Sequence, residues 1–537
     1  MKNQSTTKGF AILSAAGIAV KIISLLYIPF LIGIIKEDGY GVYLASYQIF
    51  TFIYVITNAG IPVAISKLVS ELIAVKNYKD AVKSFKIARF LLLILGIIMS
   101  TLMIVFATPF AKAVHSPRSA LAIKALAPTI LFTSVVSSYR GYFQGRGNMT
   151  PTAVSQVLEQ IANTIFSLVF AVLLIKYGVE AGAAGGTIGT TVGAFTAGIF
   201  LIWFYEKNKT MKISQISSGI SGARHSNTYL IKKILSYGIP ITLCVGLQNA
   251  GTIVDLYNIL GRLAVAGFNE SASSIKYGIL GKYNMLIGVP IAIISALSAA
   301  ILPAISRAAI LKDKSAVQNK INYAFRLCFL ISIPCAVGLA VLSEPVFRLL
   351  FARYYEGYKL MQYGSLVIVL MSIVLIQTTI LQSIGKLYLS TFYLVLGISG
   401  KVIANYILVA IPSINISGAI YGSMICFIIP LVLSNKLIKS SLKIRYNLFN
   451  QALKPLIASA FMGIVVYVSY VNIAWVLKFS NKIYINNAIA TIVSIAIGTY
   501  IYLYGLILTG GITEKDLISM PSRLVKIIPR KMLKRIR

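Results

Sequence analysis

Residues 9–35 read GFAILSAAGIAVKIISLLYIPFLIGII, and Lys21 is the only charged residue among them. A transmembrane helix needs about 20 mostly apolar residues to cross roughly 30 Å of hydrocarbon, so this segment is long enough. It has a charge in its middle and no obvious small-residue cleavage site. We therefore interpret it as a retained helix and not as a signal peptide.

Similar apolar runs continue along the chain and predict an all-α polytopic membrane protein with about 14 transmembrane helices. After the first run they lie near residues 41–64, 90–111, 121–144, 152–176, 181–205, 234–260, 277–304, 322–343, 362–385, 389–411, 415–436, 453–476 and 485–509. The 537 residues are 57% hydrophobic and 12% charged, whereas a soluble domain carries about a quarter charged residues. This composition excludes disorder and a disulfide scaffold, and a nucleic-acid partner would not need so much apolar sequence.

The formal net charge of +36 comes from 50 Lys and Arg residues against 14 Asp and Glu residues. Most of the basic residues lie at the termini and in the loops that would share a side with them. The positive-inside rule therefore places both termini in the cytoplasm, for a multi-pass protein of the cytoplasmic membrane. The basic tail, residues 511–537, is predicted to bind anionic lipids, with a plain solvated tail as the alternative.

Two stretches suggest an internal duplication, because Gly60–Ser66 reads GIPVAIS and Gly288–Ser295 reads GVPIAIIS. An even number of helices between the copies predicts two pseudo-symmetric six-helix lobes of parallel orientation, plus two C-terminal helices. The predicted parts are an N-terminal lobe over 1–206, a cytoplasmic linker over 207–232, a C-terminal lobe over 233–437 and the last two helices within 438–510. Chance similarity between apolar segments is the alternative.

Charged residues inside the predicted spans are the candidates for function, because a charge at the centre of a membrane helix costs roughly 2.5–3.5 kcal/mol on insertion scales. Lys21 lies on one helical stripe with Ser14, Gly17 and Ser24, which predicts that it faces a cavity. The excess of lysines over acids predicts an anionic substrate. The candidates for substrate binding are Lys21, Lys282, Arg140 and Lys401, and those for gating or ion coupling are Asp255 and Glu159.

Each candidate also has a structural interpretation. A lysine can extend its amine to the membrane surface, and Arg140 and Glu159 can form an ion pair that joins two helices. Glycines repeat in the run near 181–205 and predict close helix packing, because no phosphate-loop Gly-Lys-Ser/Thr follows them. The cysteines and histidines show no metal spacing, so neither a metal, a cofactor nor an enzymatic activity is predicted.

Two motifs resemble a known family: GIPVAISKLVSE at residues 60–71 and RGYFQGRGNMTPTAVSQVLEQ at residues 140–160. They are similar to the stage V sporulation protein B family of the multidrug/oligosaccharidyl-lipid/polysaccharide exporter superfamily, which is close to the lipid II flippases. The resemblance implies fourteen helices in two lobes, with the last two helices forming a groove for a lipid tail. It also implies movement of an undecaprenyl-pyrophosphate-linked glycan across the cytoplasmic membrane.

The resemblance matches Lys21 to a basic residue that lines the flippase cavity, and Lys282 lies close to another cationic position. Tyr27 stands where those flippases have a second basic residue, and an acidic residue has no counterpart around 39–41. These departures leave the exact lipid-linked substrate open.

We therefore expect a lipid II-like flippase that works by alternating access in peptidoglycan or spore cortex synthesis. The expected partners are the lipid-linked pyrophosphate glycan and cell-wall synthesis proteins. The alternatives are a cation-coupled exporter of organic cations and a non-transport scaffold for sporulation.

Overall fold

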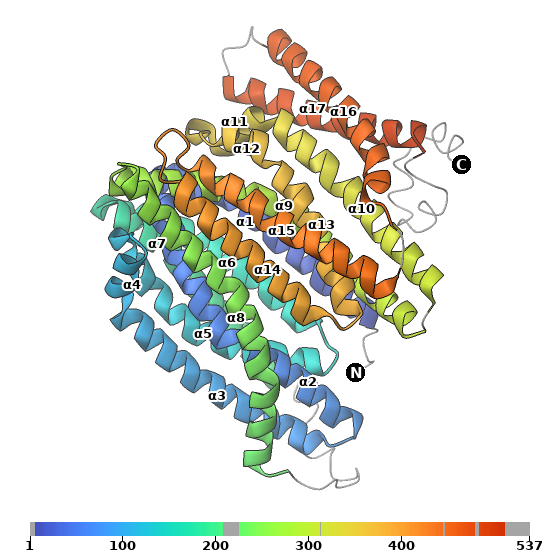
Figure 1. Cartoon of the computed structure of the whole chain (residues 1–537). Coiled ribbons are helices and arrows are strands. Elements are labelled where there is room, and N and C mark those ends of the chain that lie inside the picture. The colour runs from blue at the N-terminus through green and yellow to red at the C-terminus, as the bar shows by residue number, and fades with distance from the viewer. Residues whose placement is uncertain (1–5, 208–224, 312, 444–445, 478–482, 511–537) are drawn as a thin grey trace. The chain divides into compact units, whose positions relative to one another are not determined.

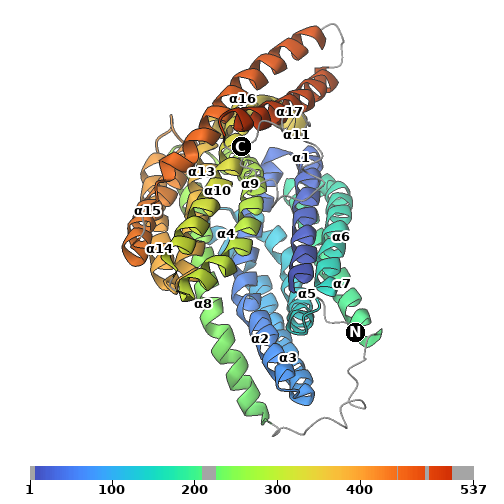
Figure 2. The ribbon, with the colours of Figure 1, turned by 90° about the vertical axis from the view of Figure 1, so that its right-hand side faces the viewer.

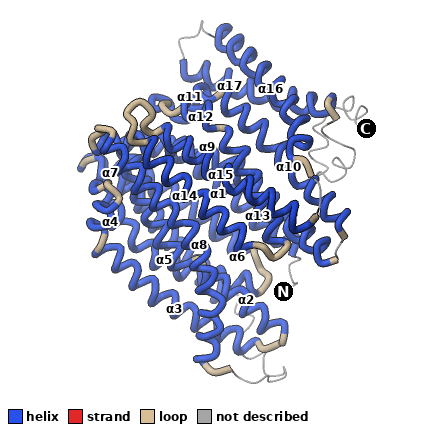
Figure 3. Tube along the Cα trace, viewed as in Figure 1, coloured by secondary structure: helices blue, strands red, loops and turns tan. Residues whose placement is uncertain are grey.

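The computed structural model describes residues 6–207, 225–311, 313–443, 446–477 and 483–510, and helices are the regular elements in these ranges (Figures 1 and 3). Most of the predicted linker and all of the predicted basic tail, residues 511–537, lie outside them. By its contacts the chain forms two compact units, residues 1–281 and 282–537, and the boundary falls inside one long helix.

Unit 1 contains the first eight helices and the start of the ninth. They are α1 (Thr6–Asn58), α2 (Gly60–Ala74), α3 (Tyr78–Val105), α4 (Ala107–Ala113), α5 (Ala120–Gly145), α6 (Thr150–Leu174), α7 (Val179–Lys207), α8 (Asn227–Val265) and α9 (Glu270–Ile310), with short 3-10 turns η1 (Pro117–Ser119) and η2 (Ile175–Tyr177).

Unit 2 contains the remainder of α9 and the helices that follow it. They are α10 (Lys314–Val341), α11 (Ser343–Phe351), α12 (Tyr358–Gly364), α13 (Leu366–Ser383), α14 (Leu387–Leu408), α15 (Ser417–Leu442), α16 (Leu448–Leu477) and α17 (Ile483–Leu508), with a 3-10 turn η4 (Ala352–Tyr354). The pairs α14–α15 and α16–α17 each pack together, and Figures 1 and 2 show α16 beside α17.

The helices confirm an all-helical polytopic membrane protein. In the described ranges, 12 helical stretches are long and apolar enough to cross a membrane. The first of them, Ile12–Ala74, runs through the first two predicted spans, and the backbone breaks inside α1 at Lys36, where φ is 61°. The predicted span near 234–260 is helical as part of α8.

The break in α1 is held by a charged cluster in unit 1. Arg118 of η1 donates two hydrogen bonds, of 2.8 and 2.9 Å, to the carboxylate of Asp38, just after the break. The same guanidinium reaches Glu180 at the start of α7 at 3.2 Å, and the Arg118 backbone N–H donates to Glu270 at the start of α9. One arginine thus joins four elements, through the bidentate geometry that favours arginine over lysine.

The contact between α6 and α7 depends on glycines, as the sequence predicted. A Cβ added at Gly193 would lie 2.6 Å from the carbonyl oxygen of Glu159, and one at Gly189 would collide with the backbone of Ser167. Atoms cannot approach that closely, so these positions accept only glycine if the two helices are to keep their spacing. The glycine stripe therefore brings the backbone of α7 against the polar face of α6.

The boundary between the two compact units lies after Gly281, whereas the predicted N-terminal lobe ends at residue 206. Helix α8 packs against α1 and α2 inside unit 1, and a Cβ at Gly60 would collide with the backbone at Gly238. Unit 1 consequently extends beyond the predicted linker as far as Gly281. The two six-helix lobes of the sequence analysis stay a prediction.

Candidate functional site

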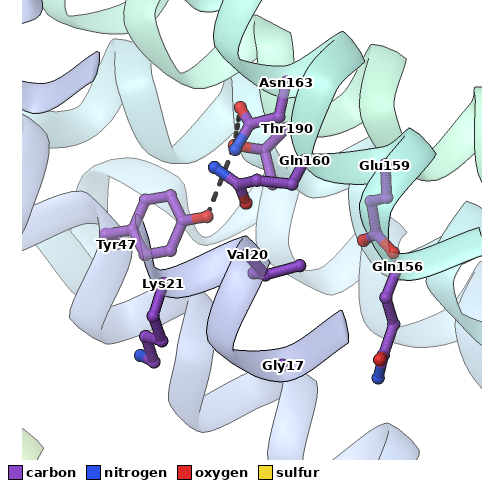
Figure 4. A pocket seen from close by; sticks show the side chains of 9 residues that line it. All are labelled: Gly17, Val20, Lys21, Tyr47, Gln156, Glu159, Gln160, Asn163 and Thr190. Carbon is purple, nitrogen blue, oxygen red and sulfur yellow. Dashed lines mark hydrogen bonds between the residues drawn. The ribbon is translucent and has the colours of Figure 1, made fainter. Parts of the chain in front are cut away.

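A cavity of about 300 Å³ opens inside unit 1 between α1, α6 and α7 (Figure 4). Seven of its nine lining residues have polar side chains, although apolar atoms make up most of the lining surface, and two of the predicted site residues are among the seven. The lining residues are Gly17, Val20, Lys21, Tyr47, Gln156, Glu159, Gln160, Asn163 and Thr190. A concave site with a few convergent polar groups is the usual form of a ligand pocket.

Lys21 contributes the positive charge of this pocket. It lies on α1 with an exposed side chain, and Gly17 one turn earlier also lines the cavity, so half of the predicted stripe reaches it. Ser24 instead donates to the carbonyl of Val20 in its own helix, at 2.9 Å. Within the described ranges Lys21 makes no hydrogen bond or ion pair, so its charge is available to a ligand.

Glu159 lines the cavity and forms an ion pair with Arg140, which is not one of the lining residues. The Arg140 Nη2 atom lies 2.6 Å from Glu159 Oε2, and Arg140 Nε donates to Ser155 Oγ at 2.9 Å. The side chains are 17% and 25% exposed, which makes this a half-buried pair that joins α5 to α6. The ion pair of the structural interpretation is therefore present, while the roles of Arg140 in substrate binding and of Glu159 in gating stay predictions. Lys21 is then the charged lining residue without an ion-pair partner in the described ranges.

A chain of hydrogen bonds fixes the far wall of the pocket. The hydroxyls of Tyr47 and Thr190 lie 3.4 Å apart, and Thr190 donates to the Asn163 side-chain carbonyl at 3.3 Å (Figure 4). Ser167 donates to the same oxygen at 2.9 Å. This wall joins α1, α6 and α7 and presents neutral polar groups to the cavity.

The neutral polar side chains of the lining were not among the residues predicted from the sequence. Gln156, Gln160 and Asn163 recur at i, i+4 and i+7, which places them on one face of α6, and this polar face inside an apolar run was the available signal. Tyr47 and Thr190 lacked such a signal, because tyrosine and threonine are common in membrane helices. Packing alone brings them to the pocket.

The other predicted residues lie elsewhere. In unit 2 the Lys282 side chain is 0% exposed, its amine donates to the carbonyl of Tyr354 at 2.6 Å, and it lies over the ring of Phe351 at 5.5 Å. Lys401 is half-buried on α14 against Gly422 of α15. In unit 1, Asp255 is half-buried on α8. A role in binding or gating stays a prediction for all three.

Comparisons with known proteins agree on the family. The model of the family described as "Polysaccharide biosynthesis protein" matches residues 6–309, more than half of the chain. Stage V sporulation protein B of Bacillus subtilis (strain 168) is 27% identical over 65% of this chain and 68% of its own length. Lipid II flippase MurJ of the same organism is 25% identical over 93% of this chain and 94% of its own.

Solved structures show the same fold. A lipid II flippase MurJ structure in an inward closed conformation matches with a TM-score of 0.67 at 16% identity, covering 95% of this chain and all of that one. An inward-facing multidrug resistance transporter of the MATE family matches with a TM-score of 0.61, covering 79% of this chain and 99% of its own. The chain therefore belongs to the polysaccharide biosynthesis protein family, and it is a multi-pass membrane transporter of the multidrug/oligosaccharidyl-lipid/polysaccharide exporter superfamily.

Proposed function

We propose that this protein is a flippase that moves an undecaprenyl-pyrophosphate-linked cell-wall glycan precursor across the cytoplasmic membrane. The observation that carries the proposal is the pocket of unit 1, where Lys21, which has no partner among the described residues, places a positive charge among polar groups in a candidate membrane-spanning helix. Lysine binds phosphate as a point charge, and inside a membrane such a charge is costly without a ligand or water.

The charge balance of the pocket favours an anionic ligand. Glu159 is the acid in the lining, and its carboxylate is held by Arg140. Lys21 would therefore hold the pyrophosphate, and the Arg140–Glu159 pair would position the face of α6 beside it. A cation-coupled exporter would need an unpaired acid in this place.

The remaining candidate residues complete the proposal. Lys282 and Lys401 would contact the substrate at other stages of transport, and Asp255 would gate or couple an ion. Movement between inward-open and outward-open states could be driven by the membrane potential, which is worth about 2.3 kcal/mol per charge at 100 mV. The relatives named for lipid II and for sporulation support a substrate and partners from cell-wall or spore cortex synthesis.

Charge reversal at Lys21 tests this function. We expect Lys21→Glu to abolish turnover of the lipid-linked precursor in cells that depend on the protein, because a carboxylate would repel pyrophosphate. Lys21→Arg, which keeps the charge, should retain part of the turnover. The readout is the pool of lipid-linked precursor on each side of the membrane after depletion of the wild-type copy.

A matched control separates this effect from a general loss of positive charge. Lys124 is exposed on α5 and does not line the pocket, so Lys124→Glu should leave precursor turnover unchanged. Normal growth and normal precursor turnover in the Lys21→Glu strain, at wild-type protein level, would refute the proposed role and favour the scaffold.

A further inference from the structure

The lining of the pocket contains buried polar side-chain atoms that have no partner among the described residues. Gln156 Oε1 and Gln160 Nε2 are buried and make no hydrogen bond within the described part of the chain, although both side chains line the cavity. A buried amide atom without a partner is unfavourable, and two of them on neighbouring turns of α6 call for an explanation. A rotation of each terminal amide would turn these atoms toward a ligand in the cavity.

The neighbouring wall is rigid and complementary to such a ligand. Asn163 is held in place because its carbonyl oxygen accepts from both Thr190 and Ser167. The Tyr47 ring packs between Tyr43 and Phe50, with ring centroids at 5.3 and 5.5 Å. The wall thus offers an aromatic ring on α1 opposite amide groups on α6, and it carries no net charge because Glu159 is paired with Arg140.

This combination suits a sugar better than a phosphate or a cation. A hexose ring has an apolar C–H face that can lie on an aromatic ring, and its hydroxyl and acetamido groups both donate and accept hydrogen bonds, as glutamine amides do. The cavity of about 300 Å³ lies at the small end of the range for ligand pockets. It would hold one sugar residue and not a long glycan.

We propose that Gln156 and Gln160, with Tyr47, form a subsite for the first sugar of the substrate, an uncharged hexose bearing hydroxyl and acetamido groups. This inference rests on the proposed function, because it takes the pyrophosphate to lie at Lys21 in the same pocket. It adds that the two glutamines determine specificity for the glycan, whereas Lys21 recognises the lipid pyrophosphate.

Binding to the full-length protein in lipid nanodiscs tests the subsite with three probes. They are undecaprenyl pyrophosphate, the same lipid carrying one N-acetylglucosamine, and an alkyl N-acetylglucosaminide without phosphate. We expect the wild type to bind the glycosylated lipid about tenfold more tightly than the bare lipid, as two additional hydrogen bonds would give. Gln156→Leu/Gln160→Leu should bind both lipids equally, at the wild-type affinity for the bare lipid.

The control is Thr164→Val, which removes another unpartnered buried polar atom of α6 that does not line the pocket. It should keep the tenfold preference. If the double variant does not fold, the single variants Gln156→Met and Gln160→Met, which preserve volume, give the same comparison. A glutamine variant that retains the preference, or one that loses affinity for both lipids in parallel, overturns the subsite.

The third probe separates the two proposals. In one outcome, binding of the alkyl glycoside depends on the glutamines, and Lys21→Glu leaves binding of the bare lipid unchanged. This result would refute pyrophosphate recognition by Lys21 and sustain the sugar subsite. In the opposite outcome, Lys21→Glu abolishes binding of the bare lipid, and the glutamine variants bind the glycoside as the wild type does. This result would sustain the proposed function and refute the subsite.

Discussion

At the level of single residues, two lysines that lie inside candidate membrane-spanning helices have opposite surroundings. Lys21 is exposed to a polar cavity and has no partner in the described ranges, whereas Lys282 is fully buried and donates to a backbone carbonyl at 2.6 Å. Each solution offsets the cost of a charge away from bulk water, one by a cavity and the other by protein dipoles. Lys21 is therefore the better candidate to bind a ligand, because its amine does not have to give up a contact with the described part of the protein.

The Arg140–Glu159 pair gives a prediction at this scale. Both side chains are less than a third exposed, so removal of either charge leaves the other poorly solvated. We expect a double-mutant cycle with Arg140→Gln and Glu159→Gln to give a coupling energy of about 1–3 kcal/mol in thermal or denaturant unfolding.

The exposed pair Lys67–Glu71 is the matched control. Its atoms lie 4.0 Å apart and its side chains are 56% and 41% exposed, so solvent screens the interaction. The corresponding cycle should give about 0.5 kcal/mol or less. Equal coupling in the two cycles would contradict the view that Arg140 holds Glu159 at the pocket wall.

At the scale of elements, the glycines of α7 position the polar face of α6. Gly189 and Gly193 face the backbone of Asn163 and Glu159, two of the residues that line the pocket. A methyl group at either glycine would push α6 away and widen the cavity. The glycine repeat therefore serves the site through packing, without contacting a ligand.

A comparison of two glycines on the same helix tests this point. Gly193→Ala should destabilise the protein by about 1–3 kcal/mol, since the new Cβ collides with the Glu159 carbonyl, and it should weaken binding of the lipid probes. At Gly198 the nearest neighbour of an added Cβ is a Val136 methyl at 3.7 Å, an ordinary contact. Gly198→Ala should be neutral or slightly stabilising, because alanine favours helix. Equal stability of both variants would refute close packing as the determinant.

At the scale of the whole molecule, the distribution of basic residues predicts which loops lie in the cytoplasm. The turn after α2 is on the predicted cytoplasmic side, and the turn before α7 is on the opposite side. Val75 and Tyr177, in these two turns, are both 71% exposed, so cysteines placed there would be equally accessible in the isolated protein.

We expect a membrane-impermeant maleimide to label Tyr177→Cys but not Val75→Cys in intact cells, with the native cysteines replaced. Both should react after permeabilisation. The reverse pattern would show the opposite orientation in the membrane and would refute cytoplasmic termini.

The helices and the class of protein could be predicted from the sequence alone. Apolar runs of sufficient length must form helices in a membrane, because each backbone group then finds a partner within the same segment. The break at Lys36 also falls in the gap predicted between the first two runs. These features depend on residues close together in the chain, so a local pattern was enough to predict them.

The surroundings of the candidate charges, in contrast, became known only from the way the helices pack. Packing pairs Arg140 with Glu159, and it buries Lys282 so that its amine donates to a backbone carbonyl. It also assembles the pocket from α1, α6 and α7, including Tyr47 and Thr190, which no sequence pattern indicated. The physical reason is that the surroundings of a side chain depend on which helix faces meet. In this protein that choice is made by glycine contacts and interhelical hydrogen bonds between segments far apart in the chain.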